Sequence, residues 1–294
     1  MTYRWPKVSE LYGGVGQRRG FDSKLYFLRQ ALRFWARSFL ARKQISQFVA
    51  QINQDHRLIE FFLVNRGGDY RIVCIDFANQ NLSRAQRMEL IWENCLILLK
   101  FDHSIFQKLI QHQEILLFSH EDVQIVFKVN GTFEEGFLAV EMQCNHQRIY
   151  GASFCIDPSK QALIIASIQG LIQGDEAREK IKIMTKKCYG LRPQICLIEA
   201  MRYMMAFFDC RILWGISQSA QVRFSSRKRG YFADYDQLWD EVGGVRCGDY
   251  FDITQTQRKE LDEIPSQKRS MYKKRFALLD EMRDAIERKF DAMR

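Results

Sequence analysis

Apolar and polar positions divide the chain into helical ends around a β-rich centre. From Ile115 onward, five apolar runs occur at regular spacing, and turn-forming residues separate them. The run at 123–129 alternates apolar and polar side chains over much of its length, as one half-exposed face of an antiparallel sheet does. The five runs are Ile115–Phe118, Val123–Val129, Phe137–Cys144, Ile149–Ile156 and Leu163–Ile168. We therefore predict an antiparallel meander.

Helical periodicity dominates before and after this meander. The predicted helices are Leu82–Phe101, which Ser83 can cap, then Asp175–Lys187, Gln194–Phe208 and residues 255–294. A strand, Arg211–Ile216, is predicted between the last two helices. Antiparallel strands followed by helix–strand units indicate an α+β fold with a mixed, largely antiparallel sheet and flanking helices. Two further β-rich runs, Ile59–Val64 and Arg71–Phe77, lie on either side of Gly67-Gly68 and predict a hairpin.

The length of 294 residues is near the upper limit for one hydrophobic core. The pattern predicts three parts. Residues 1–56 form a basic, amphipathic helical segment, residues 57–250 form the α+β core, and residues 251–294 form a charged C-terminal helix.

The N-terminal part contains a predicted helix, Asp22–Gln44, with two distinct faces. One face carries large apolar side chains at helical spacing: Leu25, Leu28, Leu32, Trp35 and Phe39. Another carries Arg29, Arg33 and Arg37 in a row. A helix of this kind can lie in a membrane interface, where arginine meets lipid phosphate and tryptophan lies at headgroup depth. It can equally pack on the protein's own core with its arginines in water, and the sequence leaves both interpretations open.

Charge favours an anionic partner for this end of the chain. The net charge is +9, and residues 1–43 hold 10 Lys/Arg against 2 Asp/Glu. We expect no specific nucleic-acid partner, because no recognition fold or aromatic platform is evident. The longest stretch without a charge, Gln161–Gly174, is shorter than the roughly 20 residues of a spanning helix, and no apolar run follows the N-terminal charges. We expect the 8 cysteines to be reduced and largely buried, and we predict no metal site.

The first candidate binding site follows the last strand of the meander. Gln169, Gly170 and Gly174 lie between this strand and a predicted helix, where free backbone N–H groups can bind phosphate. A strand, a glycine-containing loop and a helix also hold the pyrophosphate of coenzyme A in acetyltransferase-type (GNAT) folds. The resemblance is loose, because the glycines have a different register. Ordinary turn chemistry is the alternative explanation.

The second candidate surrounds the break between two predicted helices. Lys186 and Arg192 lie on either side of Gly190, and together they can hold an anion. Glu199 lies in an apolar stretch of the next helix, where a desolvated carboxylate is a candidate catalytic base. The alternative is that Glu199 pairs with Arg202 or with Arg192.

Two further segments carry clustered cations. Arg223–Arg229 is a basic loop with one aromatic residue, and it can bind phosphate or a lipid surface or lie free in solvent. In the C-terminal helix, Lys268, Tyr272 and Arg275 fall on one face, next to Arg269. This stripe is a candidate anion site near a helix start, with Tyr272 as a candidate acid or base.

Several of these motifs, in this order, resemble the VirK/YbjX family of Gram-negative bacteria. The resemblance covers roughly residues 20–285. The motifs are Thr185-Lys186-x-x-x-Gly190-Leu191-Arg192-Pro193, Tyr235-Asp236-x-x-Trp239 with Gly243-Gly244, and Ser266-x-Lys268-Arg269-x-x-Tyr272-x-x-Arg275-x-x-Leu278-Leu279-Asp280. The chain has Tyr189 where we expect relatives often to have histidine, so the resemblance does not carry a histidine-dependent mechanism to this position.

The resemblance implies a role in the cell envelope. Family members are associated with virulence, with surface display of outer-membrane proteins and with resistance to cationic antimicrobial peptides, but not with an established reaction. We hold two hypotheses. The first is a GNAT-like transferase that moves an acyl or aminoacyl group, with acyl-CoA as the candidate donor. The second is a non-catalytic accessory that binds an anionic inner-membrane surface or an envelope component. Both imply a cytoplasmic location, with peripheral attachment at the inner membrane as the further expectation.

Overall fold

The computed structural model describes residues 1–12, 23–170, 174–222, 224, 234–255 and 258–293. Its strands form one sheet in the order β1-β2-β3-β4-β5-β6-β8-β7. The strands are β1 (Ile115–His120), β2 (Val123–Val129), β3 (Leu138–Cys144), β4 (Gln147–Asp157), β5 (Ala162–Gly170), β6 (Ile212–Ile216), β7 (Val245–Cys247) and β8 (Tyr250–Asp252). Strands β5 and β6 are parallel, and every other neighbouring pair is antiparallel. This architecture confirms the predicted α+β class.

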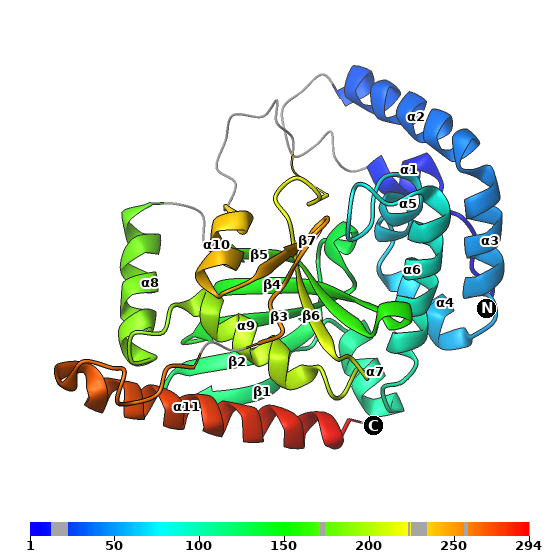
Figure 1. Cartoon of the computed structure of the whole chain (residues 1–294). Helices are drawn as coiled ribbons and strands as arrows, with labels where there is room; N and C mark the ends of the chain where they lie inside the picture. Colours follow the sequence, from blue (N-terminus) through cyan, green and yellow to red (C-terminus); the bar gives the residue numbers. More distant parts are fainter. Residues whose placement is uncertain (13–22, 171–173, 223, 225–233, 256–257, 294) are drawn as a thin grey trace.

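The helices surround this sheet (Figure 1). They are α1 (Val8–Tyr12), α2 (Ser23–Leu40), α3 (Arg42–Ile52), α4 (His56–Val64), α5 (Gly68–Cys74), α6 (Arg84–Leu98), α7 (His103–Ile110), α8 (Asp175–Lys187), α9 (Pro193–Met204), α10 (Tyr235–Glu241) and α11 (Ser266–Asp291). Helix α11 packs against β1 and α9, and α9 packs against β3, β4 and β5. Helices α2 to α7 gather at the right of Figure 1, and α8 lies at the left.

The predicted meander is confirmed, strand by strand, as β1 to β5. Asn145 and His146 have φ values of 49° and 60°, and such a two-residue turn matches the twist of the β3–β4 hairpin. The predicted strand at 211–216 is confirmed as β6. Sequence periodicity missed β7 and β8, because strands of three residues are too short to show alternation.

The predicted hairpin at 59–77 is wrong, because both runs are helical. Asp55 caps α4 by accepting a hydrogen bond from the N–H of Arg57. Gly67, with φ of 98°, begins α5 instead of turning a hairpin. Short apolar runs suit a buried helix as well as a strand, so tertiary packing decides between them.

Other predicted helix limits also needed correction. Residues 258–265 are not helical, and α11 begins at Ser266, directly after Pro265. The predicted helix 194–208 starts one residue earlier and ends at Met204. The predicted helix 22–44 is two helices, α2 and α3, that meet at Ala41. By contrast, Ser83 caps α6 as predicted, in a reciprocal capping box with Gln86.

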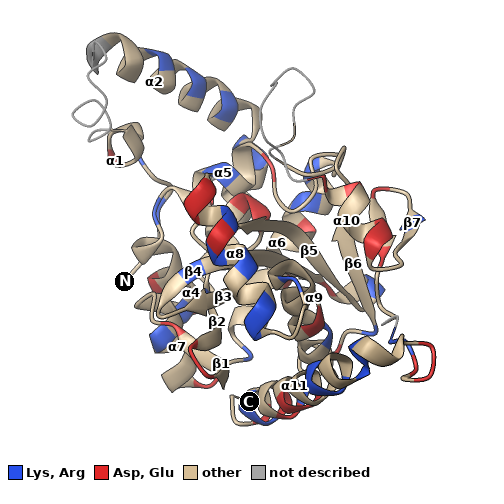
Figure 2. Cartoon of the chain, turned by 90° about the vertical axis from the view of Figure 1, so that its left-hand side faces the viewer, with Lys and Arg blue, Asp and Glu red and all other residues tan. Residues whose placement is uncertain are grey.

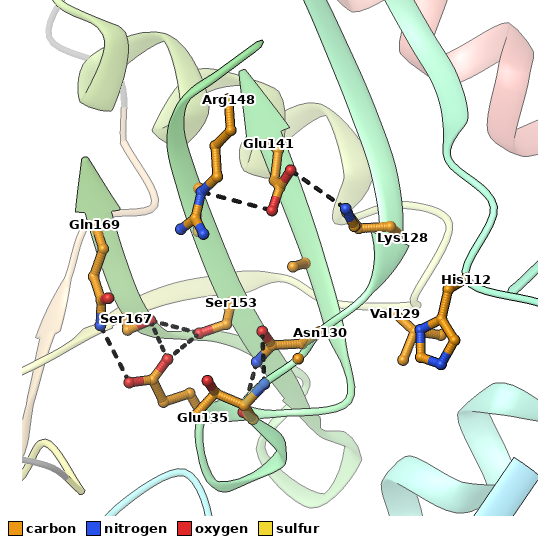
Figure 3. Close-up of a pocket in the computed structure, with 15 residues that line it drawn as sticks. His112, Lys128, Val129, Asn130, Glu135, Glu141, Arg148, Ser153, Ser167 and Gln169 are labelled. Atoms are coloured by element: carbon orange, nitrogen blue, oxygen red, sulfur yellow. Dashed lines mark hydrogen bonds and ion pairs between the residues drawn. The ribbon is translucent and has the colours of Figure 1, made fainter. Parts of the chain in front are cut away.

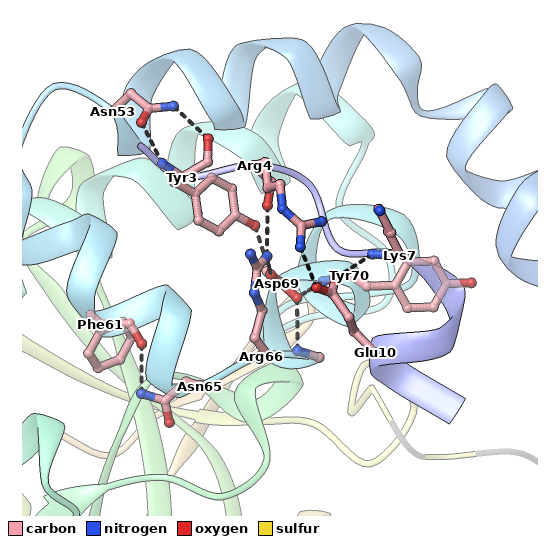
Figure 4. Close-up of polar contacts among 11 residues, drawn as sticks. Tyr3, Arg4, Lys7, Glu10, Asn53, Phe61, Asn65, Arg66, Asp69 and Tyr70 are labelled. Carbon is pink, nitrogen blue, oxygen red and sulfur yellow. Dashed lines mark hydrogen bonds and ion pairs between the residues drawn. The ribbon is translucent and has the colours of Figure 1, made fainter. Parts of the chain in front are cut away.

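The N-terminal residues join the main core through a buried polar contact (Figure 4). The hydroxyl of Tyr3 donates to the carboxylate of Asp69 (2.7 Å), which also accepts from the N–H groups of Gly67 (3.0 Å) and Tyr70 (2.7 Å). Burial raises the pKa of Asp69, and these donors oppose that shift. The ring of Tyr3 packs edge-on against Phe48, in the same apolar cluster as the sheet. Residues 1–12 and α3 therefore contribute to the core that covers the sheet.

Candidate functional site

The pairing of the parallel strands β5 and β6 ends well before β5 does. They pair only from Ala162 with Ile212 to Ile165 with Gly215, although β5 continues to Gly170. Just beyond Ile165, the β4–β5 register shifts by one residue, so that Ala166 is an extra residue on β5. A bulge of this kind bends a strand and changes where its groups point. Beyond this point β5 has no partner on its β6 side among the described strands, and we call this break in pairing the gap.

Helix α10 lies at this gap and is hydrogen-bonded to the strands on both of its sides. The hydroxyl of Tyr235 accepts from the N–H of Ile168 (3.2 Å) and donates to its carbonyl (3.3 Å), in place of a neighbouring strand. Asp236 accepts from the N–H of Gln218 (2.6 Å), and the indole of Trp239 donates to the carbonyl of Ile216 (2.7 Å). Burial raises the pKa of Tyr235, so its hydroxyl stays protonated and can donate. The motif Tyr235-Asp236-x-x-Trp239 thus bonds α10 to both parallel strands.

An apolar cavity with a basic rim lies beside the gap. It has a volume of about 570 Å³, and its apolar wall includes Tyr150, Ile181 and Met271. Lys186 and Arg192 line it as well, with Lys182. A smaller cavity of about 220 Å³ shares Tyr150 and Arg192 and reaches Ile168 at the gap. The larger cavity can accept an apolar chain that carries an anionic group. The smaller one is also lined by the carboxylates of Asp234 and Glu241.

The residues predicted to bind a phosphate or another anion are only partly brought together. Lys186 and Arg192 share the apolar cavity, although Arg192 also pairs with Glu241. Gly170 leaves room for the ring of Tyr150 in the wall of this cavity, because a Cβ at position 170 would lie 2.6 Å from that ring. Gln169 instead donates to Glu135 (3.2 Å), which lines a different cavity.

Gly174 immediately precedes α8, whose first turn is acidic. Asp175 and Glu176 already place two carboxylates at this helix N-terminus. They satisfy the positive end of the helix dipole and repel a second anion. The rest of the predicted loop, 171–173, lies outside the described residues. The described geometry therefore favours Lys186 and Arg192 over Gly174 as contacts for an anionic ligand.

Glu199 is buried on α9, beside Arg202. Both side chains are 7% exposed and form an ion pair. Arg202 also donates to the carbonyls of Ile253 (2.7 Å from Nη2) and Gln255 (3.2 Å). The observed contact is the structural pairing that the sequence left open, and it links α9 to the chain after β8. A catalytic role for Glu199 stays a prediction.

The predicted cation stripe on α11 is used largely for backbone contacts. Arg275 donates through Nε and Nη2 to the carbonyl of Tyr189 (3.1 and 2.9 Å), and its guanidinium lies 4.1 Å from the ring centre of Tyr272. Arg269 donates to the carbonyls of Ile264 (2.9 Å) and Asp262 (3.2 Å). Lys268 is exposed. Two family motifs meet here, since Arg275 holds the turn at Tyr189 and Gly190.

Helix α2 exposes the apolar face that the sequence identified. It packs inward through Ala31 and Phe34, and the ring of Phe34 lies 4.9 Å from that of Tyr70. Its outward residues are 55–67% exposed: Leu25, Leu28, Leu32, Trp35, Phe39 and Leu40. Arg29, Arg33 and Arg37 are exposed on a further face, and Figure 2 shows these basic bands along α2, at the edge of the molecule. We call the outward apolar side chains, from Leu25 to Leu40 and without the arginines, the α2 apolar face.

Sequence reasoning missed a polar cavity on the sheet, shown in Figure 3. Its charged and hydroxyl groups come from separate strands and, for Glu135, from the short 3-10 helix Phe133–Glu135 between β2 and β3, so no local motif contains them. The available signal was Ser153 and Ser167, two polar residues within otherwise apolar runs. The predicted basic loop 223–229 lies almost entirely outside the described residues. Among the helices that the structure describes, none is long and apolar enough to cross a bilayer.

These features define an α+β protein with a mixed sheet, a gap between its parallel strands and an exposed apolar helix. Residues 24–288 match the family described as "Protein of unknown function (DUF535)". The chain belongs to this family, the VirK/YbjX family. No solved structure gives a significant match.

Three relatives illustrate this membership. An uncharacterized protein of Haemophilus influenzae is 31% identical over 98% of this chain and 96% of its own length. "Membrane protein LapB" of Mannheimia haemolytica is 29% identical over 77% of this chain and 96% of its own length. "Uncharacterized protein YbjX" of Escherichia coli is 28% identical over 44% of this chain and 40% of its own length.

Proposed function

We propose that this protein acts in homeostasis of the bacterial envelope at an anionic membrane surface, which it binds through the α2 apolar face. The observation that carries the proposal is the row of large apolar side chains that α2 leaves in water. Moving one such side chain fully out of water contributes about 1.5–3 kcal/mol. Several of them on one helix, beside three arginines, suit insertion at the boundary between headgroups and acyl chains. The printed name of the Mannheimia haemolytica relative, a membrane protein, supports the same setting.

The charges on α2 specify the kind of surface. Arg29, Arg33 and Arg37 are exposed along one face of the helix, where phosphate groups of anionic lipids can pair with them. We expect the protein to bind vesicles of phosphatidylglycerol and phosphatidylethanolamine, and to bind phosphatidylcholine vesicles much more weakly. Vesicle flotation measures both.

Replacing Leu28, Leu32 and Trp35 together by glutamine is expected to reduce binding to anionic vesicles at least about tenfold, since each side chain contributes more than 1 kcal/mol when buried. These residues are exposed, so the melting temperature should stay close to that of the wild type. Changing Arg29, Arg33 and Arg37 to glutamate should also abolish binding. The matched control changes Lys108, Lys273 and Arg288, exposed residues of α7 and α11, to glutamate and should retain most of it. Wild-type binding by the glutamine variant would contradict the proposal.

A second candidate function is acyl or aminoacyl transfer by a GNAT-like core. The observation that favours it is the early end of the β5–β6 pairing next to the apolar, basic-rimmed cavity. In GNAT folds a separated strand pair is where the cofactor enters. Here Lys186 and Arg192 would contact the donor phosphate, and the wall with Tyr150 and Ile181 would contact its chain.

Coenzyme A, acyl-CoA and aminoacyl-tRNA are the donors to test by thermal-shift titration. We expect at least one to raise the melting temperature by a few degrees, because ligand at about 100 times its dissociation constant stabilises by about 2.7 kcal/mol. Replacing Lys186 and Arg192 by alanine should abolish the shift. Replacing Arg178, an exposed residue of the same helix as Lys186, should preserve it. If no donor stabilises the wild type, the transferase proposal fails and the membrane proposal is unaffected.

A further inference from the structure

The polar cavity on the sheet is separate from the α2 apolar face and from the basic-rimmed cavity. It has a volume of about 340 Å³. Strands β2, β3 and β4 alternate their side chains, so that Phe127 and Phe154 face the aromatic rings of Phe290 (5.5 Å) and Phe208 (5.7 Å). The residues that alternate with these apolar ones along the strands, such as Lys128, Glu141 and Ser153, point to the opposite face and line the cavity (Figure 3). A polar floor on a sheet calls for an explanation, since burying polar groups is costly.

One half of the cavity holds a loose row of charges. Glu141 lies between Lys128 (3.5 Å) and Arg148 (3.6 Å), and both distances exceed the usual range for an N–H···O hydrogen bond. Lys128 has a closer partner in Glu114 (2.9 Å). Burial lowers the pKa of Lys128, but the hydrogen bond and charge of Glu114 and the charge of Glu141 outweigh it, so the net shift is upward and the amine stays charged. Because both cations lie at long distances from Glu141, its carboxylate can accept a shorter hydrogen bond from a ligand.

Gly151 leaves room for the guanidinium of Arg148 beside the cavity. A Cβ on Gly151 would lie 2.8 Å from Nη2 of Arg148, so any larger residue would displace the guanidinium. Figure 3 shows the end of Arg148 beside Glu141, above Ser153. The two terminal nitrogens of a guanidinium can bind a carboxylate or phosphate in a bidentate manner.

The other half of the cavity is built around Glu135, which is 4% exposed. Ser167 donates to its Oε2 (2.8 Å), and Gln169 (3.2 Å) and Gln221 (3.3 Å) donate to its Oε1. Ser153 and Ser167 are also hydrogen-bonded to each other (2.6 Å). These hydrogen bonds fix the positions of the two serine hydroxyls and the Glu135 carboxylate. It supplies both acceptors and donors next to the charged row.

We propose that this cavity binds a small zwitterion, a molecule with a primary ammonium and an anionic group. The anionic group would pair with Arg148 and Lys128, and the ammonium would donate to Glu141 and the oxygens below it. Both charges are needed, because a ligand with one charge leaves the opposite half of the row without a new partner. The volume is at the lower end of small-molecule sites, which run from about 300 to 1,000 Å³. Free amino acids and phosphoethanolamine share this chemistry.

Isothermal titration with L-alanine and with O-phosphoethanolamine tests the proposal. We expect at least one of them to bind at least about tenfold more tightly than ethanolamine or propionate, each of which carries one charge. Binding of L-alanine alone indicates an amino acid, and binding of O-phosphoethanolamine alone indicates a phosphoester. If neither zwitterion binds more tightly than the singly charged compounds, the proposal is overturned.

Two variants tie the binding to this cavity. Arg148→Met keeps an unbranched chain over Gly151 but removes the cation, and Glu141→Gln removes the carboxylate charge. Each should weaken binding at least about tenfold. Glu281→Gln, on the exposed surface of α11, is the matched control and should bind like the wild type. Melting curves verify folding, and wild-type affinity in both cavity variants would overturn the proposal. No step of this experiment depends on vesicles or on an acyl donor.

Discussion

Replacing Arg202 by methionine is expected to lower the free energy of unfolding by about 3–5 kcal/mol, the usual cost of breaking a buried ion pair from one side. The change leaves the Glu199 carboxylate in the core without the guanidinium that pairs with it. It also removes the donors to the carbonyls of Ile253 and Gln255, which hold the chain after β8 against α9. The carbonyl of the buried Ile253, which loses its donors, adds to the cost.

Urea unfolding followed by circular dichroism measures this effect. Arg283→Met is the matched control, because Arg283 is an exposed arginine of α11 and its replacement should change stability by less than about 0.5 kcal/mol. Glu199→Gln should cost less than Arg202→Met, since glutamine can still accept from the guanidinium. An Arg202 variant as stable as the wild type would refute the structural role of the pair. A folded Glu199→Gln protein without biological activity would instead support Glu199 as a catalytic group.

Replacing Trp239 by alanine is expected to cost about 3–5 kcal/mol, as for other large aromatic side chains removed from a core. The indole is fully buried beside the gap between β5 and β6, and it lies against Gly215, where a Cβ would be 2.4 Å from the ring. It also stacks on Tyr235, with ring centres 6.1 Å apart. The cavity left by alanine would loosen α10 and, with it, the hydrogen bonds of Tyr235 to Ile168.

Trp239→Phe is the comparison that separates packing from hydrogen bonding. Phenylalanine keeps a ring against Gly215 but cannot donate to the carbonyl of Ile216. We expect a loss of about 1–3 kcal/mol, the cost of an unsatisfied buried acceptor. Thermal and urea unfolding of both variants give the two values. Equal losses in both would show that the hydrogen bond dominates, and negligible losses in both would contradict the packing described for α10.

Local patterns predicted the elements that have one dominant physical signal. The meander of β1 to β5 was predicted because apolar runs and turn residues alternate there, and the turn at Asn145 and His146 has the positive φ values such a hairpin needs. The break between α8 and α9 was predicted from Gly190 and Pro193, and in the structure α8 ends at Lys187, just before Gly190, and Pro193 begins α9. The predicted hairpin at 59–77 was wrong, since a short apolar run has no unique period. Both runs are helices, with N-caps at Asp55 and Gly67.

The candidate site residues that the structure brings together are close in sequence. The α2 apolar face follows from the spacing of its leucines and aromatics, and Lys186 and Arg192 meet because one helix break brings them together. Arg275 was predicted as an anion contact, but the structure uses it to hold the carbonyl of Tyr189. Glu135, Glu141 and Arg148 were missed, because only the folded sheet brings Glu141 and Arg148, on strands, and Glu135, on the 3-10 helix between β2 and β3, into one cavity.

The sequence by itself determined the α+β class, the order of the central strands, the family and the amphipathic character of α2, because each depends on residue types at short spacing. The tertiary structure decided which side of α2 remains in water, how far β6 follows β5, and which charges share a cavity. These depend on contacts between residues tens to hundreds of positions apart, such as Tyr3 with Asp69 and Asn79 with Tyr250. Such contacts form only when the whole core packs, so local periodicity does not reveal them.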